Sequence, residues 1–164
     1  MKQKPVSDRM FSLLIMFDMQ TNYFRLALEG ISDADIHQRL NTKANHIAWL
    51  AGSLLEQRAE MTNSLGGSFR QHASELFKEN KGIQDNIIYP GLDIYKKDWD
   101  AVSTALRKLY MEVDDEKLDS ILEMPEMSFP YFDMITFTLY REASIIGQIA
   151  LWRRLLNYAP MKYM

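Results

Sequence analysis

Apolar residues return every three or four positions in four long stretches of the chain. These stretches cover residues 7 to about 28, about 45 to 66, about 92 to 113, and 128 to about 160. This spacing places the apolar side chains of each stretch on one face of an α-helix. Four long helices joined by short polar connections predict an all-α fold, an antiparallel four-helix bundle with short connecting helices.

Residues that start and stop helices mark the ends of these stretches. Ser7 and Ser128 stand where a serine side chain would cap the first and the last helix. Gly30 follows the first helix, and a glycine at that place favours a helix end. Pro130 fits the first turn of the last helix, where its missing N–H costs nothing, and Pro160 ends that helix. These markers support the helical interpretation.

The connections between the four stretches are polar. Residues 32–37 and 114–122 are predicted to form short helical turns, and residues 124–127 a linker into the last helix. Residues 68–91 are predicted to contain a short helix and a connection. The sequence lacks a clear alternation of Val, Ile and Thr, so no sheet is expected.

The length of the chain predicts a single domain covering residues 1–164, and its charge bears on its partners. The chain can bury a sizeable core, and 47% of its residues are hydrophobic. Its 22 acidic and 19 basic residues leave a net charge of −3 without a long run of either sign, so no nucleic-acid partner is expected. The apolar run that begins at Met10 is short, is followed by Asp18 and keeps a helical period. We therefore predict a cytoplasmic protein without a membrane partner.

Sulfur-containing residues restrict the chemistry further. No cysteine is present, which excludes disulfides, thiolate nucleophiles and cysteine-based metal sites. The 11 methionines are interpreted as adaptable core packing in preference to a binding surface.

A polar row interrupts the apolar pattern of the last helix. It consists of Thr138, Arg141, Ile145, Gln148 and Trp152, which follow one another at steps of three and four residues. A second row, on the second helix, consists of His46, Leu50, Ser53 and Gln57. Because polar groups line a face of each helix, we predict that the two rows meet across a pocket.

Two stretches of the chain resemble the DinB and YfiT superfamily. The sequence REASIIGQIALWRRLLNYAPMKY, residues 141–163, is similar to the last helix of that family in its Gly-Gln-Ile triplet and its Pro-Met-Lys-Tyr ending. The sequence NHIAWLAGSLLEQR, residues 45–58, looks like the motif around the first metal-binding histidine, which His46 matches. The family carries His-x-x-x-His before Gly-Gln-Ile, whereas Arg141 and Ile145 occupy those two positions here.

The resemblance implies a helical bundle, a homodimer and a site that has lost most of its metal ligands. In the family, three histidines hold a divalent metal with open positions for water or substrate. Losing two ligands removes that site in its usual form, and a guanidinium has no acceptor atom with which to replace them. We therefore expect no metal and no cofactor, with Zn or Ni bound only if the site has been rebuilt.

The central hypothesis is that Arg141 supplies a fixed positive charge where relatives hold a metal ion. Its pocket for a small acidic molecule would be lined by His46, Ser53, Gln57, Ile145 and Gln148. A guanidinium presents a fork of donors that matches a carboxylate or phosphate. Because an unpaired buried charge is costly, a ligand or an internal acid, Asp18 or Glu56, is expected to pair with it.

Other interpretations stay open beside this one. Arg141 could be a structural arginine paired with a carboxylate, His46 a hydrogen-bonded remnant, and Glu142 a solvated side chain. Three functions follow: a DinB-like binding protein or pseudoenzyme for a small acidic molecule, a DinB-like enzyme of thiol-transferase or hydrolase type, and a dimeric scaffold. The enzyme would use a rebuilt metal site or His46 as general base.

Overall fold

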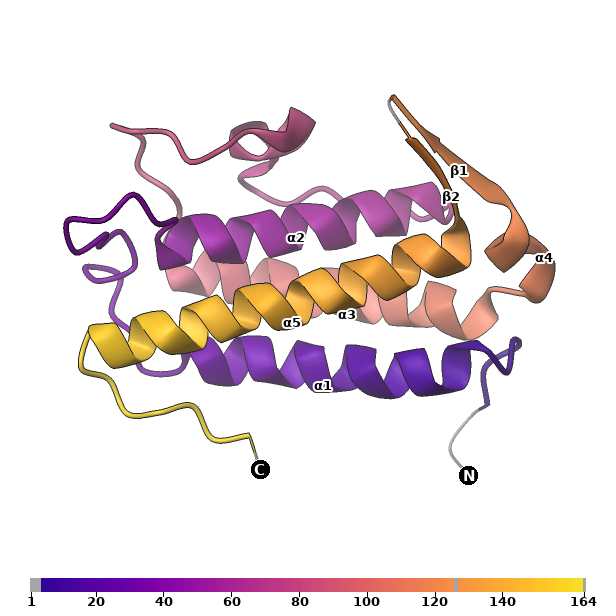
Figure 1. The fold of residues 1–164 in the computed structure, drawn as a ribbon, viewed down its shortest axis with the longest axis horizontal. Coiled ribbons are helices and arrows are strands. Elements are labelled where there is room, and N and C mark those ends of the chain that lie inside the picture. Colours follow the sequence, from indigo (N-terminus) through magenta and orange to yellow (C-terminus); the bar gives the residue numbers. More distant parts are fainter. Residues whose placement is uncertain (1–3, 126, 164) are drawn as a thin grey trace.

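The computed structural model describes residues 4–125 and 127–163. Most of them belong to four long helices: α1 (Met10–Leu28), α2 (Ile47–Ser64), α3 (Leu92–Glu112) and α5 (Tyr131–Leu155). Each helix overlaps one of the predicted stretches, so the chain is mostly helical as the apolar period indicated. Figure 1 shows the four helices lying side by side.

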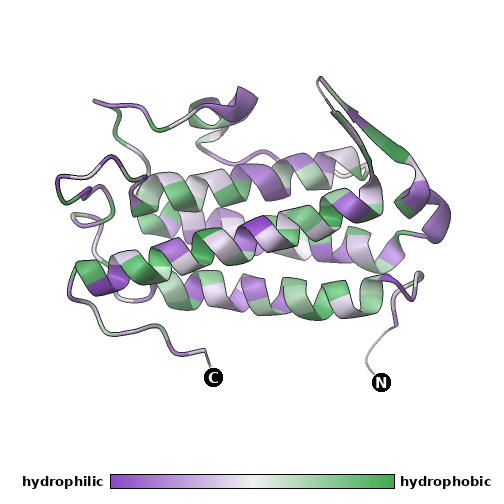
Figure 2. Cartoon of the chain, in the orientation of Figure 1, coloured by the Kyte–Doolittle hydropathy of each residue, from purple (hydrophilic) through white to green (hydrophobic). Residues whose placement is uncertain are grey.

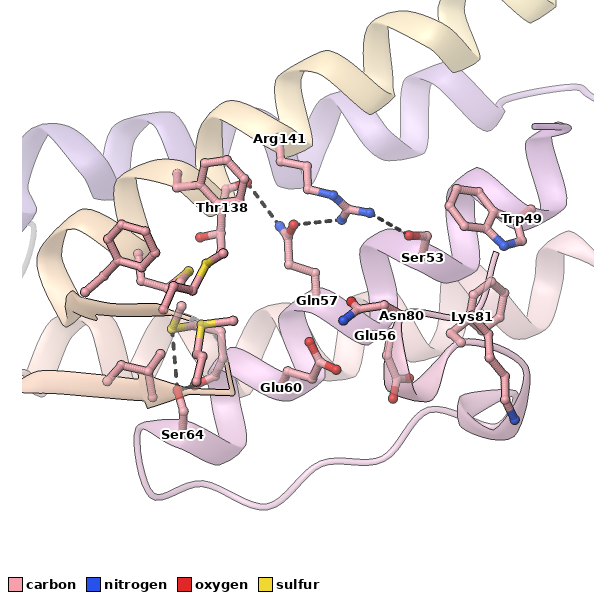
Figure 3. Close-up of a pocket in the computed structure, with 18 residues that line it drawn as sticks. Trp49, Ser53, Glu56, Gln57, Glu60, Ser64, Asn80, Lys81, Thr138 and Arg141 are labelled. Carbon is pink, nitrogen blue, oxygen red and sulfur yellow. Dashed lines mark hydrogen bonds between the residues drawn. The ribbon is translucent and has the colours of Figure 1, made fainter. Parts of the chain in front are cut away.

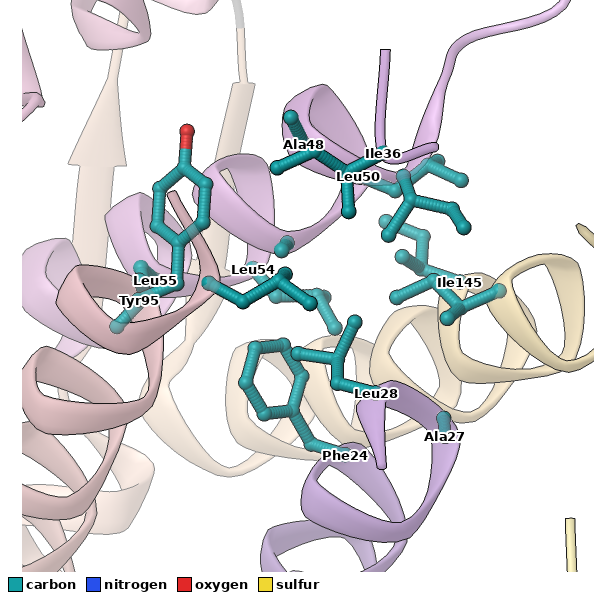
Figure 4. Close-up of a cluster of buried hydrophobic side chains, with 14 of the residues drawn as sticks. Phe24, Ala27, Leu28, Ile36, Ala48, Leu50, Leu54, Leu55, Tyr95 and Ile145 are labelled. Atoms are coloured by element: carbon teal, nitrogen blue, oxygen red, sulfur yellow. The ribbon is translucent and has the colours of Figure 1, made fainter. Parts of the chain in front are cut away.

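The long helices pack as a closed ring of neighbours. α1 contacts α3 and α5, and α2 contacts the same two helices. Hydrophobic and hydrophilic residues are mixed along each helix (Figure 2), as expected for elements that bury one face and expose another. The buried faces form two clusters, one around Phe24 and Leu54 (Figure 4) and the other around Phe17 and Leu106.

The helix starts differ in detail from the predicted caps. α1 begins at Met10 with Arg9 at its N-cap and no side-chain cap, so the predicted Ser7 cap is wrong. The Ser7 hydroxyl instead accepts a hydrogen bond from the backbone N–H of Arg9 at 3.2 Å, in the turn before α1. Ser128 lies in a strand, and α5 begins at Tyr131 with Pro130 at its N-cap and no side-chain cap. The predicted Ser128 cap is wrong because the ring of Pro130 disfavours helical geometry in the residue before it.

A short helix, α4 (Asp115–Asp119), and a β hairpin connect α3 to α5. The hairpin pairs β1 (Ile121–Met124) with β2 (Met127–Pro130) in antiparallel register. The predictions of no sheet and of a linker at 124–127 are therefore wrong for the described residues, although Glu126 lies outside them. Strands of four residues are too short for an alternating pattern to be recognised.

Residues 68–91 pass over α2 (Figure 1) and contain two 3₁₀ turns in place of the predicted short helix, η1 (Ser74–Leu76) and η2 (Lys78–Asn80). The Gln71 side chain donates a hydrogen bond from Nε2 to the backbone carbonyl of Gly52 at 3.0 Å. The ring of Phe77 covers the same glycine, where an added Cβ would lie 2.1 Å from the ring. This close approach of the segment to α2 therefore requires glycine at position 52.

Within the described ranges, no helix combines the length and the hydropathy that a membrane crossing would need.

Candidate functional site

A cavity of about 750 Å³ lies between α2, α5, the β hairpin and the segment that contains η2. Its volume falls in the range of roughly 300–1,000 Å³ that is usual for sites enclosing small organic molecules. Its polar floor comes from two helices: Ser53, Glu56, Gln57 and Glu60 of α2, and Thr138 and Arg141 of α5 (Figure 3). The remaining walls are mainly apolar.

Arg141 is held in the floor by two neutral side chains of α2. Its Nη1 donates to Oε1 of Gln57 at 2.7 Å, and its Nη2 donates to Oγ of Ser53 at 2.7 Å. Gln57 in turn donates from Nε2 to the backbone carbonyl of Thr138 at 3.1 Å (Figure 3). The structure thus brings together three of the predicted pocket residues, Ser53, Gln57 and Arg141.

The guanidinium of Arg141 lacks a carboxylate in salt-bridge contact among residues 4–125 and 127–163. Asp18 pairs with Arg107 instead, at 2.8 Å, and Glu56 accepts hydrogen bonds from Gln71 and Ser74. Neither of the two expected internal acids therefore pairs with it. Partial burial lowers the pKa of Arg141, and this effect is opposed by the charges of Glu60 and Glu142.

Glu60 places a negative charge in the same cavity. Burial against the cavity walls raises the pKa of Glu60 above its ordinary value, and Glu56 raises it further, whereas Arg141 lowers it. Two carboxylates and a guanidinium therefore share the floor, and Glu60 opposes the binding of an anion beside Arg141.

Glu142 is buried, which corrects the expectation that it faces solvent. Its side chain is only 2% exposed and accepts two hydrogen bonds from Arg58, at 2.6 and 2.7 Å. The guanidinium of Arg58 also donates to Thr21 and Ser103. This ion pair joins α2 to α5 in the interior, next to the cavity floor but without lining it.

His46 lies away from Arg141, which corrects the predicted facing of the two residues. It is the N-cap residue of α2, and its Nδ1 accepts a hydrogen bond from the backbone N–H of Trp49 at 3.1 Å. Its ring packs edge-on against His37 and Tyr89, with centroid distances of 5.3 and 5.1 Å. It borders a separate small cavity of about 180 Å³ and precedes Ser53 by about 10 Å along the helix axis.

The environment of His46 also argues against a general base. Burial lowers the pKa of His46 to about 4, with a further lowering by the nearby His37. Because Nδ1 accepts the Trp49 N–H, the neutral ring carries its proton on Nε2. The imidazole therefore has no acceptor atom left for a substrate proton or a metal.

The two remaining predicted pocket residues also lie outside the cavity. Ile145 is buried in the same core cluster as Phe24, and Gln148 is exposed. The later part of the polar row still faces the start of α2. Ile145 belongs to the same buried cluster as Leu50 (Figure 4), and Trp152 donates a hydrogen bond from Nε1 to the backbone carbonyl of Asn45, just before the N-cap of α2, at 2.9 Å. Core side chains fill this part of the interface, so the cavity extends only along the first part of the row.

The apolar walls of the cavity were not predicted from the sequence. They include four methionines, Met61, Met124, Met127 and Met134, together with aromatic side chains of α5, β2 and the η2 segment. Methionine was interpreted as core packing. The one signal in the sequence is that Met124 and Met127 stand on either side of residues 125–126, and this spacing indicates a shared face only if those two residues form the turn of a hairpin.

The described part of the chain contains no group of three or more His, Asp or Glu side chains arranged to hold a metal ion. A comparison of the sequence with protein-family models gives no match, and a comparison with curated proteins gives none either.

Proposed function

We propose that this chain is a DinB/YfiT-like antiparallel four-helix bundle without the family's metal site, and that it binds a small organic acid in the cavity between α2 and α5. The observation that carries the proposal is the position of Arg141. A half-buried guanidinium lies in the floor of a mainly apolar cavity, and the described residues that hold it are neutral, the Gln57 amide and the Ser53 hydroxyl.

The family resemblance agrees with the position of Arg141 in the cavity, but the residue of α2 that matches the family's histidine has to be revised. Arg141 stands where the family has the first histidine of its His-x-x-x-His motif, and that histidine would face a third ligand on the second helix. The residues of α2 that meet Arg141 are Ser53 and Gln57, not His46. We therefore place the family's second-helix ligand position at this pair of residues, so that this chain keeps none of the three histidines.

A carboxylate is the ligand group that this floor favours. Hydrogen bonds between ionised partners are roughly twice as strong as those between neutral ones, so a carboxylate competes well with Gln57 and Ser53 for the donors of Arg141. The apolar walls would hold the body of the acid, which excludes small inorganic anions as the best ligands. The negative charge of Glu60 weakens the attraction between Arg141 and a ligand carboxylate but does not remove it. The pKa of Glu60 is raised, so protonating Glu60 when the ligand binds costs less free energy.

The experiment compares hexanoate with its uncharged amide, hexanamide, by isothermal titration calorimetry at pH 7. We expect hexanoate to bind and hexanamide to bind at least tenfold more weakly. Arg141→Gln should weaken hexanoate binding about 10- to 100-fold, because it removes a charge-assisted contact. Glu60→Gln should tighten it about two- to fivefold, because it removes a nearby like charge.

Arg107→Gln is the matched control, since Arg107 forms an exposed pair with Asp18 that does not line the cavity. Its hexanoate affinity should equal that of the unmodified protein. Equal affinities for acid and amide, or an Arg141→Gln variant that binds hexanoate undiminished, would refute the proposed function.

A further inference from the structure

The β hairpin turns one apolar face toward the cavity. Its register pairs Leu122 with Phe129 and Met124 with Met127, so these four side chains lie on the same face of the ribbon. All four line the cavity. Met124, Met127 and Phe129 nevertheless remain 41%, 51% and 38% exposed, so the hairpin presents unfilled apolar surface to the cavity.

The helices complete an apolar half of the cavity opposite this face. Met61 of α2 and Met134 and Phe137 of α5 line the same end. Figure 3 shows the sulfur atoms gathered on the hairpin side of Thr138, away from Trp49. Methionine is unbranched and has three rotatable bonds, so walls made of it adapt to a flexible chain.

The polar half lies in the other direction along α2. Gln57 contacts Arg141, and Ser64 lies at the hairpin end of the cavity. Between these two residues α2 rises by about 10 Å, which is the separation of the two halves. On the far side of Arg141 the cavity is lined by Trp49, Asn80 and Lys81 (Figure 3). The indole N–H of Trp49 is buried and has no hydrogen-bond partner among the described residues, so this end still offers a donor.

From this separation of polar and apolar halves we infer that the ligand is an aliphatic monocarboxylic acid with an unbranched chain. Its carboxylate meets Arg141, and its chain lies under the hairpin face formed by Leu122, Met124, Met127 and Phe129. The inference rests on the proposed function and adds the class of acid. A compact dicarboxylate would leave the apolar half of the cavity empty, and a second carboxylate directed into that half would meet only apolar side chains.

The test is a chain-length series of butyrate, hexanoate, octanoate and decanoate, titrated into the unmodified protein below their micelle concentrations. Each methylene buried under the hairpin should lower the Kd about fourfold until the chain fills the apolar half. Two added carbons should therefore tighten binding about 16-fold.

Two hairpin variants locate the chain. Met127→Ser changes the cavity face, and Ile121→Ser changes a residue of equal exposure, 51%, that does not line the cavity. We expect Met127→Ser to reduce octanoate binding about tenfold while leaving butyrate binding within twofold, and Ile121→Ser to change neither. Because both side chains are already half exposed, both variants should fold.

The outcomes separate this inference from the proposed function. A flat series in which binding still depends on Arg141 would overturn the aliphatic chain and leave the acid site intact. A steep series that persists unchanged in Arg141→Gln would show detergent-like adsorption and overturn the inference. If no acid in the series binds, the proposed function fails and the inference fails with it.

Discussion

Replacing Arg58 by methionine should strongly destabilise this protein, because Arg58 neutralises the buried carboxylate of Glu142. Its guanidinium is 1% exposed and makes four hydrogen bonds, two to Glu142 and one each to Thr21 and Ser103. It also lies over the rings of Phe17 and Trp99, at 4.1 and 3.7 Å from their centroids. Among the described residues, the Glu142 carboxylate accepts hydrogen bonds from Arg58 alone, whereas Thr21 and Ser103 also bond to backbone carbonyls.

The expected magnitude follows from what Arg58→Met leaves behind. Glu142, 2% exposed, would lose both of its charged donors and stay in the interior without compensation. Breaking a buried ion pair in this way costs about 3–5 kcal/mol. A domain of this size has a free energy of unfolding of about 5–15 kcal/mol, so the variant should lose about a fifth or more of it, and its Tm should fall by about 10 °C.

Urea denaturation followed by circular dichroism measures this loss. The double variant Arg58→Met with Glu142→Leu should regain about 2 kcal/mol or more, because both charges are removed together. Arg107→Met, in the exposed pair with Asp18, is the control and should cost less than about 1 kcal/mol. A loss below 1 kcal/mol for Arg58→Met, or a double variant no more stable than that single variant, would show that the pair is not an essential buried charge.

Two further predictions concern α2 and its surroundings. Because the pKa of His46 falls from 6.5 to about 4 on folding, the unfolded chain binds protons more readily than the folded one between these values, and stability should decrease as the pH is lowered from 7 to 4.5. We expect the free energy of unfolding to fall by about 2 kcal/mol over this range. The loss should be absent in His46→Asn, which keeps an acceptor at the N-cap. Urea titrations at several pH values measure it, and equal pH profiles of the two proteins would contradict this prediction. Gly52→Ala should destabilise by about 1–3 kcal/mol, because its Cβ would displace the Phe77 ring, whereas Gly147→Ala, with nothing within 4 Å, should stabilise by about 0.5–1 kcal/mol. Thermal unfolding measures both, and a Gly52→Ala variant as stable as Gly147→Ala would contradict the tight contact.

The candidate site could be predicted only where helical spacing alone decides which residues share a face. Ser53 and Gln57 lie four residues apart on α2, and both do meet Arg141. His46 has the same spacing pattern, but it precedes the first turn of α2, where its side chain caps the helix instead of extending from its face. Gln148 fits the spacing on α5 but is exposed, because the side of α5 that meets the start of α2 is occupied by Ile145 and Trp152.

Glu142 is a residue of the site region whose burial could not be predicted from helical spacing. A glutamate is usually solvated, and no pattern near position 142 indicates that Arg58, 84 residues earlier, is buried against it. The hairpin is a similar case, because its short strands acquire their apolar face only through the pairing of Leu122 with Phe129.

The sequence by itself determined the four long helices, because the apolar spacing that predicts each helix lies entirely within that stretch of the chain. It also determined that a guanidinium on the last helix would meet polar residues of the second. Only the tertiary structure decided that Arg58 neutralises Glu142, that His46 stands apart, and that a methionine-lined hairpin closes one side of the cavity. These features depend on which side chains meet from elements far apart in the chain, and the packing of all four helices together decides which of them meet.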